Sequence, residues 1–249
     1  VQLAGVNSIN WARVLAQVVY YFSAAVALGA PQRMVSFTVP TGNFGDIFAG
    51  YIAKRMGLPI DRLVVATNQN DILHRCLQGQ GYHKGQTIPS ISPSMDIQVS
   101  SNFERALFDA YDRDGNAVAQ LMDELKAGGF DVSQGAMQTL ADHFSSGRVS
   151  ENETSAQITA TLRDSAELLC PHSAVGVHVA DAQRVHGTPM VTLATAHPAK
   201  FPDAVEAASG IRPPLPSRMA DLYDRSERLT RVPNDLEALK AHIIAHRAT

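Results

Sequence analysis

Apolar and polar positions alternate along the chain in a way that predicts interleaved strands and helices. An apolar stretch over residues 8–28 is broken by polar residues at helical spacing, which indicates a long helix. Residues 34–39 and 63–67 are short apolar runs typical of buried strands, and residues 46–56 between them repeat at helical spacing. A strand, a helix and a second strand in such quick succession predict a βαβ unit and hence a parallel sheet.

The middle of the chain reads as helical. From residue 101 onward, apolar residues recur every three or four positions, and the last of this series is Phe144. The remaining expected elements are helices over 154–169 and 174–185, a strand over 189–193, a short helix after 200, and a last helix capped by Asn234.

This alternation predicts an α/β fold with a doubly wound, mostly parallel sheet, helices on both faces and a helical insertion. We expect residues 1–100 to form the first part of the α/β domain. Residues 101–150 would form the helical insertion, and residues 151–249 would complete the domain and carry the last helix.

Composition narrows the class of protein without naming a function. Apolar residues make up 45% and charged residues 18% of the 249 residues, with a formal net charge of −3, so we predict neither nucleic-acid nor membrane partners. Cys76 and Cys170 lie far apart in sequence, which favours a reduced, cytoplasmic protein. The histidines at 172, 178 and 186 lack the spacing of metal ligands, so no metal site is expected.

One loop between a strand and a helix carries a candidate for anion binding. In VPTGNFGDIFAG, residues 39–50, Gly42 and Gly45 bracket Asn43 and Phe44, and Asp46 opens the next helix. Free backbone N–H groups and the helix dipole favour an anion there. The loop has neither the lysine of a phosphate-binding P-loop nor the glycine spacing of a dinucleotide fold. Spacing alone leaves two interpretations open, a phosphate site and a plain tight turn.

A second polar group lies at the start of the first helix. Asn7, Ser8, Asn10 and Arg13 can hold a phosphate or carboxylate of a substrate. The alternative is that Asn7 or Ser8 only caps the helix and that Arg13 is a solvated residue.

Longer segments give the chain a family resemblance. NSINWARVLAQVVYYF at 7–22, PTGNFGDIFAGYIAKRMGLP at 40–59, SPSMDIQVSSNFERALFD at 92–109 and TAHPAKFPDAV at 195–205 closely resemble bacterial threonine synthases, in the same order. These enzymes use pyridoxal 5′-phosphate, have the tryptophan-synthase-β-like fold (fold type II), and convert O-phospho-L-homoserine and water to L-threonine and phosphate by γ-elimination and β-addition.

The resemblance implies roles for individual residues. Gly42, Asn43, Phe44, Gly45 and Asp46 would line the cup for the cofactor's phosphate. Thr195 matches a hydroxyl partner of the pyridine nitrogen, and a neutral partner makes the cofactor a weaker electron sink than a carboxylate would.

The resemblance also implies that a part of the enzyme is missing. The lysine that forms the Schiff base lies in the family's N-terminal portion, and none of the chain's lysines stands in that context. We therefore expect the C-terminal part of a threonine synthase, inactive alone, whose partner is the missing N-terminal half. Two alternatives are a non-catalytic phosphate- or cofactor-binding module and a related serine or threonine dehydratase.

Overall fold

The computed structural model describes residue 5 and residues 7–246. Residues 7–213 lie in one compact unit, and residues 214–246 belong to a second, which is described by itself. The predicted boundaries at 100 and 150 stay predictions, and positions 1–4, 6 and 247–249 of the predicted segments lie outside the described residues.

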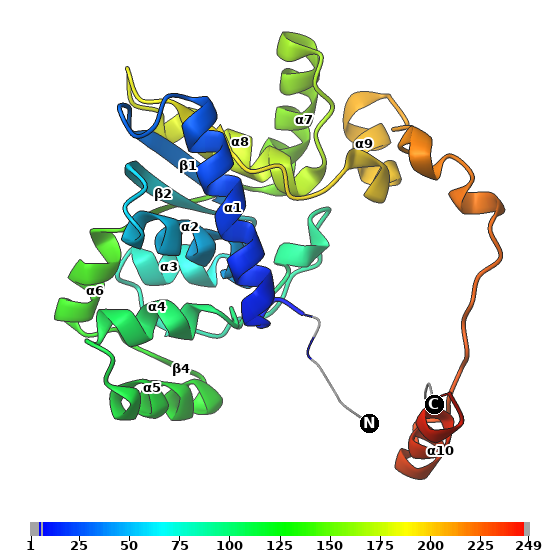
Figure 1. Ribbon diagram of the computed structural model, residues 1–249, viewed down its shortest axis with the longest axis horizontal. Coiled ribbons are helices and arrows are strands. Elements are labelled where there is room, and N and C mark those ends of the chain that lie inside the picture. Colours follow the sequence, from blue (N-terminus) through cyan, green and yellow to red (C-terminus); the bar gives the residue numbers. More distant parts are fainter. Residues whose placement is uncertain (1–4, 6, 247–249) are drawn as a thin grey trace. The chain divides into compact units, whose positions relative to one another are not determined.

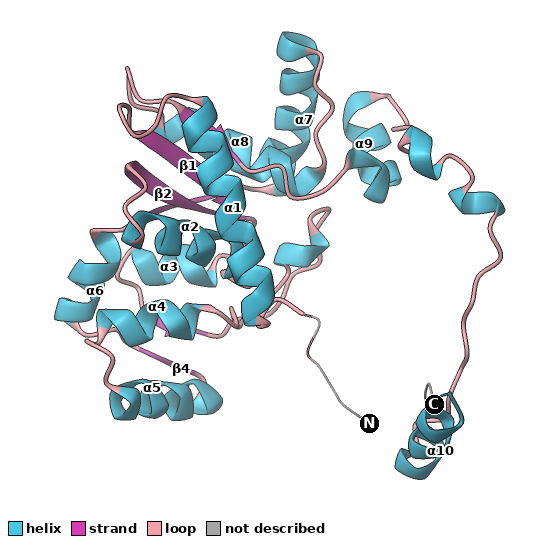
Figure 2. Cartoon of the chain, viewed as in Figure 1, coloured by secondary structure: helices cyan, strands magenta, loops and turns pink. Residues whose placement is uncertain are grey.

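A four-stranded parallel sheet forms the centre of the first unit (Figures 1 and 2). The strand order is β5-β2-β1-β6, with all three neighbouring pairs parallel. The strands are β1 (Val35–Pro40), β2 (Ile60–Thr67), β5 (Phe144–Arg148) and β6 (Met190–Thr192). Because the strands are parallel, their carboxyl ends meet at one edge, where open α/β sheets bind ligands.

Helices cover both faces of this sheet. Alternate residues of β2 pack into two different hydrophobic clusters, one on each face. Leu63 and Val65 belong to the large hydrophobic cluster that includes α1 (Trp11–Ala27) and α2 (Gly45–Arg55). Val64 and Ala66 pack in a second cluster with Val175 and Val179 of α8 (Pro171–Gln183). Successive side chains of a strand point to opposite faces, so the sheet is buried on both sides. The doubly wound α/β prediction is confirmed.

The other elements of this unit lie around the sheet. They are α3 (Ile72–Leu77), α4 (Phe103–Ala110), α5 (Gly115–Ala127), α6 (Gln134–Ala141), α7 (Glu151–Ser165), α9 (Pro202–Ser209) and the short antiparallel pair β3 (Tyr82–His83) and β4 (Gly129–Phe130).

The helical interpretation of the middle region is wrong at its end. Phe144 continues the spacing of α6 but begins β5, the edge strand of the parallel sheet. Phe144 is the only large apolar residue in FSSGR, so the strand lacks the apolar run by which β1 and β2 were predicted.

Helix caps also differ from the predictions at two places. The cap of α1 is Asn10, whose side chain accepts a hydrogen bond from the Ala12 N–H, and not Asn7 or Ser8. In the second unit, the last helix, α10 (Leu236–His246), begins after Asp235. Asp235 accepts from the Ala238 N–H at 2.8 Å, which is the role predicted for Asn234.

Candidate functional site

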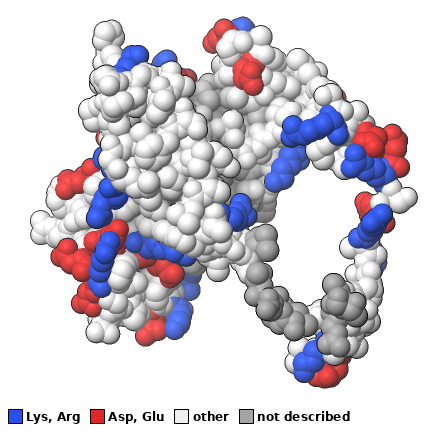
Figure 3. Space-filling model, in the orientation of Figure 1, with Lys and Arg blue, Asp and Glu red and all other residues white. Residues whose placement is uncertain are grey.

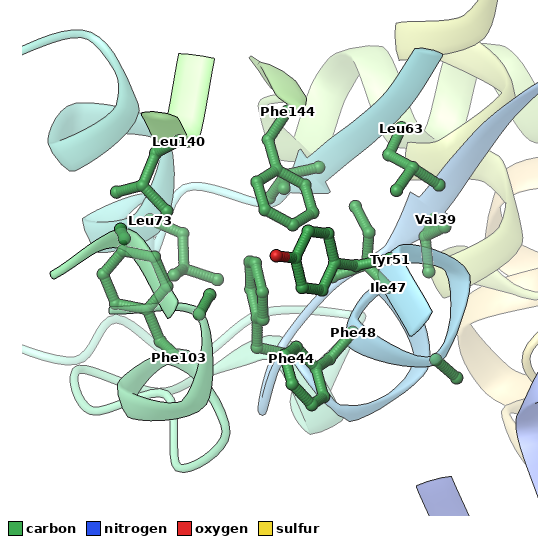
Figure 4. Packing of buried hydrophobic residues seen from close by; sticks show 14 of the residues in the cluster. Val39, Phe44, Ile47, Phe48, Tyr51, Leu63, Leu73, Phe103, Leu140 and Phe144 are labelled. Atoms are coloured by element: carbon green, nitrogen blue, oxygen red, sulfur yellow. The ribbon is translucent and has the colours of Figure 1, made fainter. Parts of the chain in front are cut away.

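The loop between β1 and α2 is held by an aromatic anchor. Phe44 has a left-handed backbone conformation, φ 60°, which is uncommon for a residue with a side chain. Its ring is 1% exposed and lies edge-on to Phe103 and Phe144, with ring centroids 5.3 and 5.2 Å away (Figure 4). Burial of this ring offsets the strain of the loop. The side chain of Phe44 therefore belongs to the hydrophobic core.

The N–H groups of the loop are unpaired. In the part of the chain that the structure describes, no backbone N–H of residues 42–47 donates to a protein acceptor, whereas Thr41 N–H donates to the Ala66 carbonyl. α2 has no side-chain cap, so the positive end of its dipole is open. Because Phe44 and Gly45 are buried, their N–H groups need an acceptor.

Close packing, rather than unusual backbone angles, limits the space at the two glycines, since neither has a positive φ. A Cβ at Gly42 would lie 2.5 Å from the carbonyl oxygen of Ser94. A Cβ at Gly45 would lie 3.3 Å from Nδ2 of Asn102. The close approach at these glycines is to neighbouring segments, and the residue of the loop with a positive φ is Phe44.

Residues from the start of α1 form the opposite wall of a cavity over this loop. The cavity has a volume of about 160 Å³ and is lined by residues 40–47 together with Ser8, Arg13 and Gln17. Among the described residues, Arg13 forms no ion pair, so its charge is available to an anion. Gln17 was not predicted, although it lies one helical turn after Arg13 and interrupts the same apolar stretch.

Asp46 lines the same cavity, but its carboxylate is turned toward α1. Its Oδ1 accepts a hydrogen bond from the Tyr21 hydroxyl at 3.2 Å, and the same hydroxyl donates to the Asp46 carbonyl at 2.8 Å. Burial raises the pKa of Asp46 from 3.8 to about 6, although the bond from Tyr21 works in the opposite direction. Asp46 therefore offers an anion its unpaired N–H, while its carboxylate is bonded to Tyr21.

The remaining predicted site residues, Asn7, Asn10 and Thr195, are not among the residues that line this cavity. Asn7 accepts from the Ile9 N–H at 3.1 Å, and Asn10 is occupied in capping α1. Thr195 is exposed and lies three positions after β6. β6 pairs in parallel with β1, so Thr195 follows the same edge of the sheet as the loop.

A larger cleft exists elsewhere in the unit. It has a volume of about 790 Å³ and lies between α1, α2, α4 and α5, with walls formed by Trp11, Phe48 and Phe108. It is largely apolar and contains none of the unpaired loop N–H groups, so we place the candidate site in the smaller cavity. On the face drawn in Figure 3, Lys and Arg are interspersed with Asp and Glu, and the surface over α1 is largely uncharged.

No group of three or more His, Cys, Asp or Glu side chains among the described residues is arranged to hold a metal ion. None of the described helices is long and apolar enough to cross a membrane.

The cavity therefore fits the phosphate end of a ligand. It is smaller than the roughly 300–1,000 Å³ of typical whole-ligand sites, and its donors are loop N–H groups, a helix N-terminus and one unpaired guanidinium. Asn43 also lines the cavity, and its Oδ1 accepts from the Ser101 hydroxyl at 3.3 Å.

Comparison with known proteins identifies what this arrangement resembles. A sequence family described as "Threonine synthase, C-terminal" matches residues 173–243. The threonine synthase of Pseudomonas aeruginosa is 54% identical over 248 residues, which cover 98% of this chain and 53% of that protein.

Solved structures agree with the sequence comparison. A structure described as pyridoxal-phosphate-bound threonine synthase from Brucella melitensis is 56% identical, with a TM-score of 0.95, and the match covers 98% of this chain and 53% of that one. Yeast threonine synthase is 40% identical, with a TM-score of 0.87, over 96% of this chain and 53% of its own. The chain thus spans about half the length of the relatives that it matches.

Proposed function

Because the chain belongs to the threonine synthase family and corresponds to its C-terminal portion, we propose that it forms the phosphate-binding half of a pyridoxal-phosphate-dependent threonine synthase. The reaction of the whole protein would convert O-phospho-L-homoserine and water to L-threonine and phosphate. The observation that carries the proposal is the row of unpaired N–H groups over residues 42–46, facing a cavity at the carboxyl edge of the sheet.

Residues 42–46 hold the phosphate of the cofactor in this proposal. Pyridoxal phosphate, when bound, supplies an electron sink for carbanions next to the substrate nitrogen. Thr195 offers a neutral hydroxyl to the pyridine nitrogen, and Asn7, Ser8, Asn10 and Arg13 orient the substrate's phosphate or carboxylate. Of these four residues, Ser8 and Arg13 line the cavity, which supports the roles proposed for them.

The catalytic lysine must come from outside this chain. Lys54 is the lysine nearest in sequence to the loop, and its ammonium group lies 3.4 Å from the carbonyl of Asp61, at the start of β2. The start of β2 is the opposite edge of the sheet from the cavity. Each of the other four lysines also has a contact of its own. Lys84 donates to the Lys126 carbonyl, and Lys126 pairs with Asp123. Lys240 pairs with Glu237, and Lys200 lies over the ring of Phe201.

We propose the N-terminal half of the enzyme as the partner of α1. Trp11, Leu15, Val19 and Tyr20 of this helix are 45–58% exposed, and an apolar row of this kind is typical of a surface that another segment covers. The relatives contain about as much chain again as the part matched here. A cytoplasmic location remains part of the proposal, as for a biosynthetic enzyme.

Substrate preference tests the function. The full-length protein, supplied with pyridoxal phosphate, is expected to release threonine and phosphate in equal amounts from O-phospho-L-homoserine and to leave L-serine unchanged. Pyruvate and ammonia from serine would instead support the dehydratase alternative. Binding of the cofactor without turnover of either substrate would support the binding-module alternative.

A further inference from the structure

Asn102, the residue just before α4, connects the two walls of the cavity. It is fully buried, and its amide Nδ2 donates to the carbonyl of Ser8 and to the carbonyl of Asn43, both at 2.9 Å. Its own backbone N–H donates to the same Asn43 carbonyl at 3.0 Å. One side chain therefore holds the start of α1 and the glycine-rich loop at a fixed separation.

The orientation of this amide is set by a neighbouring charge. The Nε of Arg105 donates to Oδ1 of Asn102 at 3.1 Å, so Nδ2 must point to the two carbonyls. Arg105 also donates to the Ile9 carbonyl at 3.0 Å, and its guanidinium lies 5.2 Å from the ring centroid of Trp11. Asn102 and Arg105 thus bind the turn before α1 from two sides.

These bonds determine where the loop's N–H groups point. The Asn43 carbonyl and the Phe44 N–H belong to one planar trans peptide, in which they point in opposite directions. Two donors on that carbonyl turn the Phe44 N–H to the other side, away from Asn102. Ser100 does the same for the preceding peptide, which contains the Asn43 N–H, because its hydroxyl donates to the Gly42 carbonyl at 2.7 Å. Hydrogen bonds to a carbonyl also strengthen the N–H of the same peptide as a donor.

We propose that Asn102 is the positioning residue of the phosphate cup: it aims the N–H groups of the loop and sets the gap between the loop and Ser8. Asn102 does not line the cavity, so it acts through the loop rather than on the phosphate. This inference rests on the proposed function, which supplies the phosphate.

The test compares pyridoxal 5′-phosphate with pyridoxal, which lacks the phosphate, as ligands of the full-length protein. The variant N102D keeps the shape of the side chain and the bond from Arg105 but places an acceptor against two carbonyls. We expect its affinity for pyridoxal phosphate to fall about tenfold or more, with its affinity for pyridoxal unchanged. Equal loss of both ligands, or no loss of either, would overturn the inference.

A stability-matched control separates positioning from general loosening. Leu140 of α6 is 2% exposed and does not line the cavity, so L140A destabilises the fold but should leave the ratio of the two affinities as in the wild type. Should N102D not fold, N102S decides the question, since a hydroxyl reaches at most one of the two carbonyls and should lower the same ratio by a smaller factor. A wild-type protein that binds both ligands equally would instead refute the phosphate cup itself, and with it the proposed function.

Discussion

At position 42 the space for a side chain is taken by the backbone of another segment. The Ser94 carbonyl oxygen lies 2.5 Å from where a Cβ would stand, and a backbone carbonyl cannot move as the end of a flexible side chain can. The neighbouring Phe44 adopts the left-handed conformation instead of either glycine, and its buried ring makes this possible. Single residues thus shape the loop through sterics and packing.

Replacing Gly42 should therefore abolish the cup. G42V in the full-length enzyme is expected to weaken binding of pyridoxal phosphate strongly, because either the loop or the Ser94 segment must shift. G135A is the matched control, since a Cβ at Gly135 meets nothing within 4 Å. Equilibrium dialysis measures both variants, and an unchanged affinity of G42V would contradict the assignment of the loop.

Asp46 predicts a pH dependence of stability. Its pKa is about 6 in the folded protein against 3.8 for the ordinary group, so the folded state binds the proton more tightly. The free energy of unfolding therefore loses a contribution as pH rises from about 4 to about 6. D46N, which does not titrate, should gain stability relative to wild type across this window and hold the gain above it. Denaturant unfolding at pH 4 and pH 7 measures the difference, and an equal difference at both values would refute the shifted pKa.

Among elements, the first turn of α1 does two things at once. Asn10 caps the helix, and the turn before it carries Ser8 to the cavity. Capping thus belongs to Asn10 rather than to Asn7 or Ser8, and ligand binding at this turn stays a prediction. The sequence did not reveal which residue does which, because capping depends on where the helix begins, and sequence patterns locate helix ends poorly.

The variant N10S separates capping from substrate binding at this turn. Serine retains an oxygen for the Ala12 N–H but loses the amide. If Asn10 only caps, both the melting temperature and the KM for O-phospho-L-homoserine should stay close to wild type. A raised KM at an unchanged melting temperature would show a contact with substrate.

α7 offers a prediction away from the site. Ser150 and Glu153 form a capping box, in which each side chain binds the backbone N–H of the other. S150A should lower the free energy of unfolding by about 1 kcal/mol, measured by urea unfolding. The affinity for pyridoxal phosphate should not change, and a loss of affinity would mean that α7 also supports the cup.

On the scale of the whole molecule, the sequence predicted the central elements of the sheet, and the roles of the site residues stay predictions. Apolar periods located β1, α2 and β2, and with them the loop that they carry. Strand β5 was not predicted, because its sequence lacks an apolar run and its strand conformation depends on pairing with β2. The bond from Asn102 to Ser8 joins residues 94 positions apart, a distance over which local patterns carry no information.

The exposed apolar face of α1 predicts that the isolated chain associates with itself. Leu15 and Val19 are 49% and 58% exposed, so the 249-residue chain should self-associate at micromolar concentration. The double variant L15E/V19E should reduce this association, as measured by light scattering. N152E, which adds a charge on the exposed first turn of α7, is the control and should not. Association that is equal in all three proteins would locate the contact elsewhere.

The most direct test of the account follows oxygen through the reaction. The full-length protein is incubated with O-phospho-L-homoserine in water labelled with oxygen-18. Mass spectrometry then measures the oxygen-18 content of the threonine and of the phosphate. Elimination at the γ-carbon followed by addition of water predicts one labelled oxygen in the hydroxyl of threonine and none in the phosphate. Labelled phosphate together with unlabelled homoserine would mean simple hydrolysis of the phosphate ester, and the proposed function would be wrong.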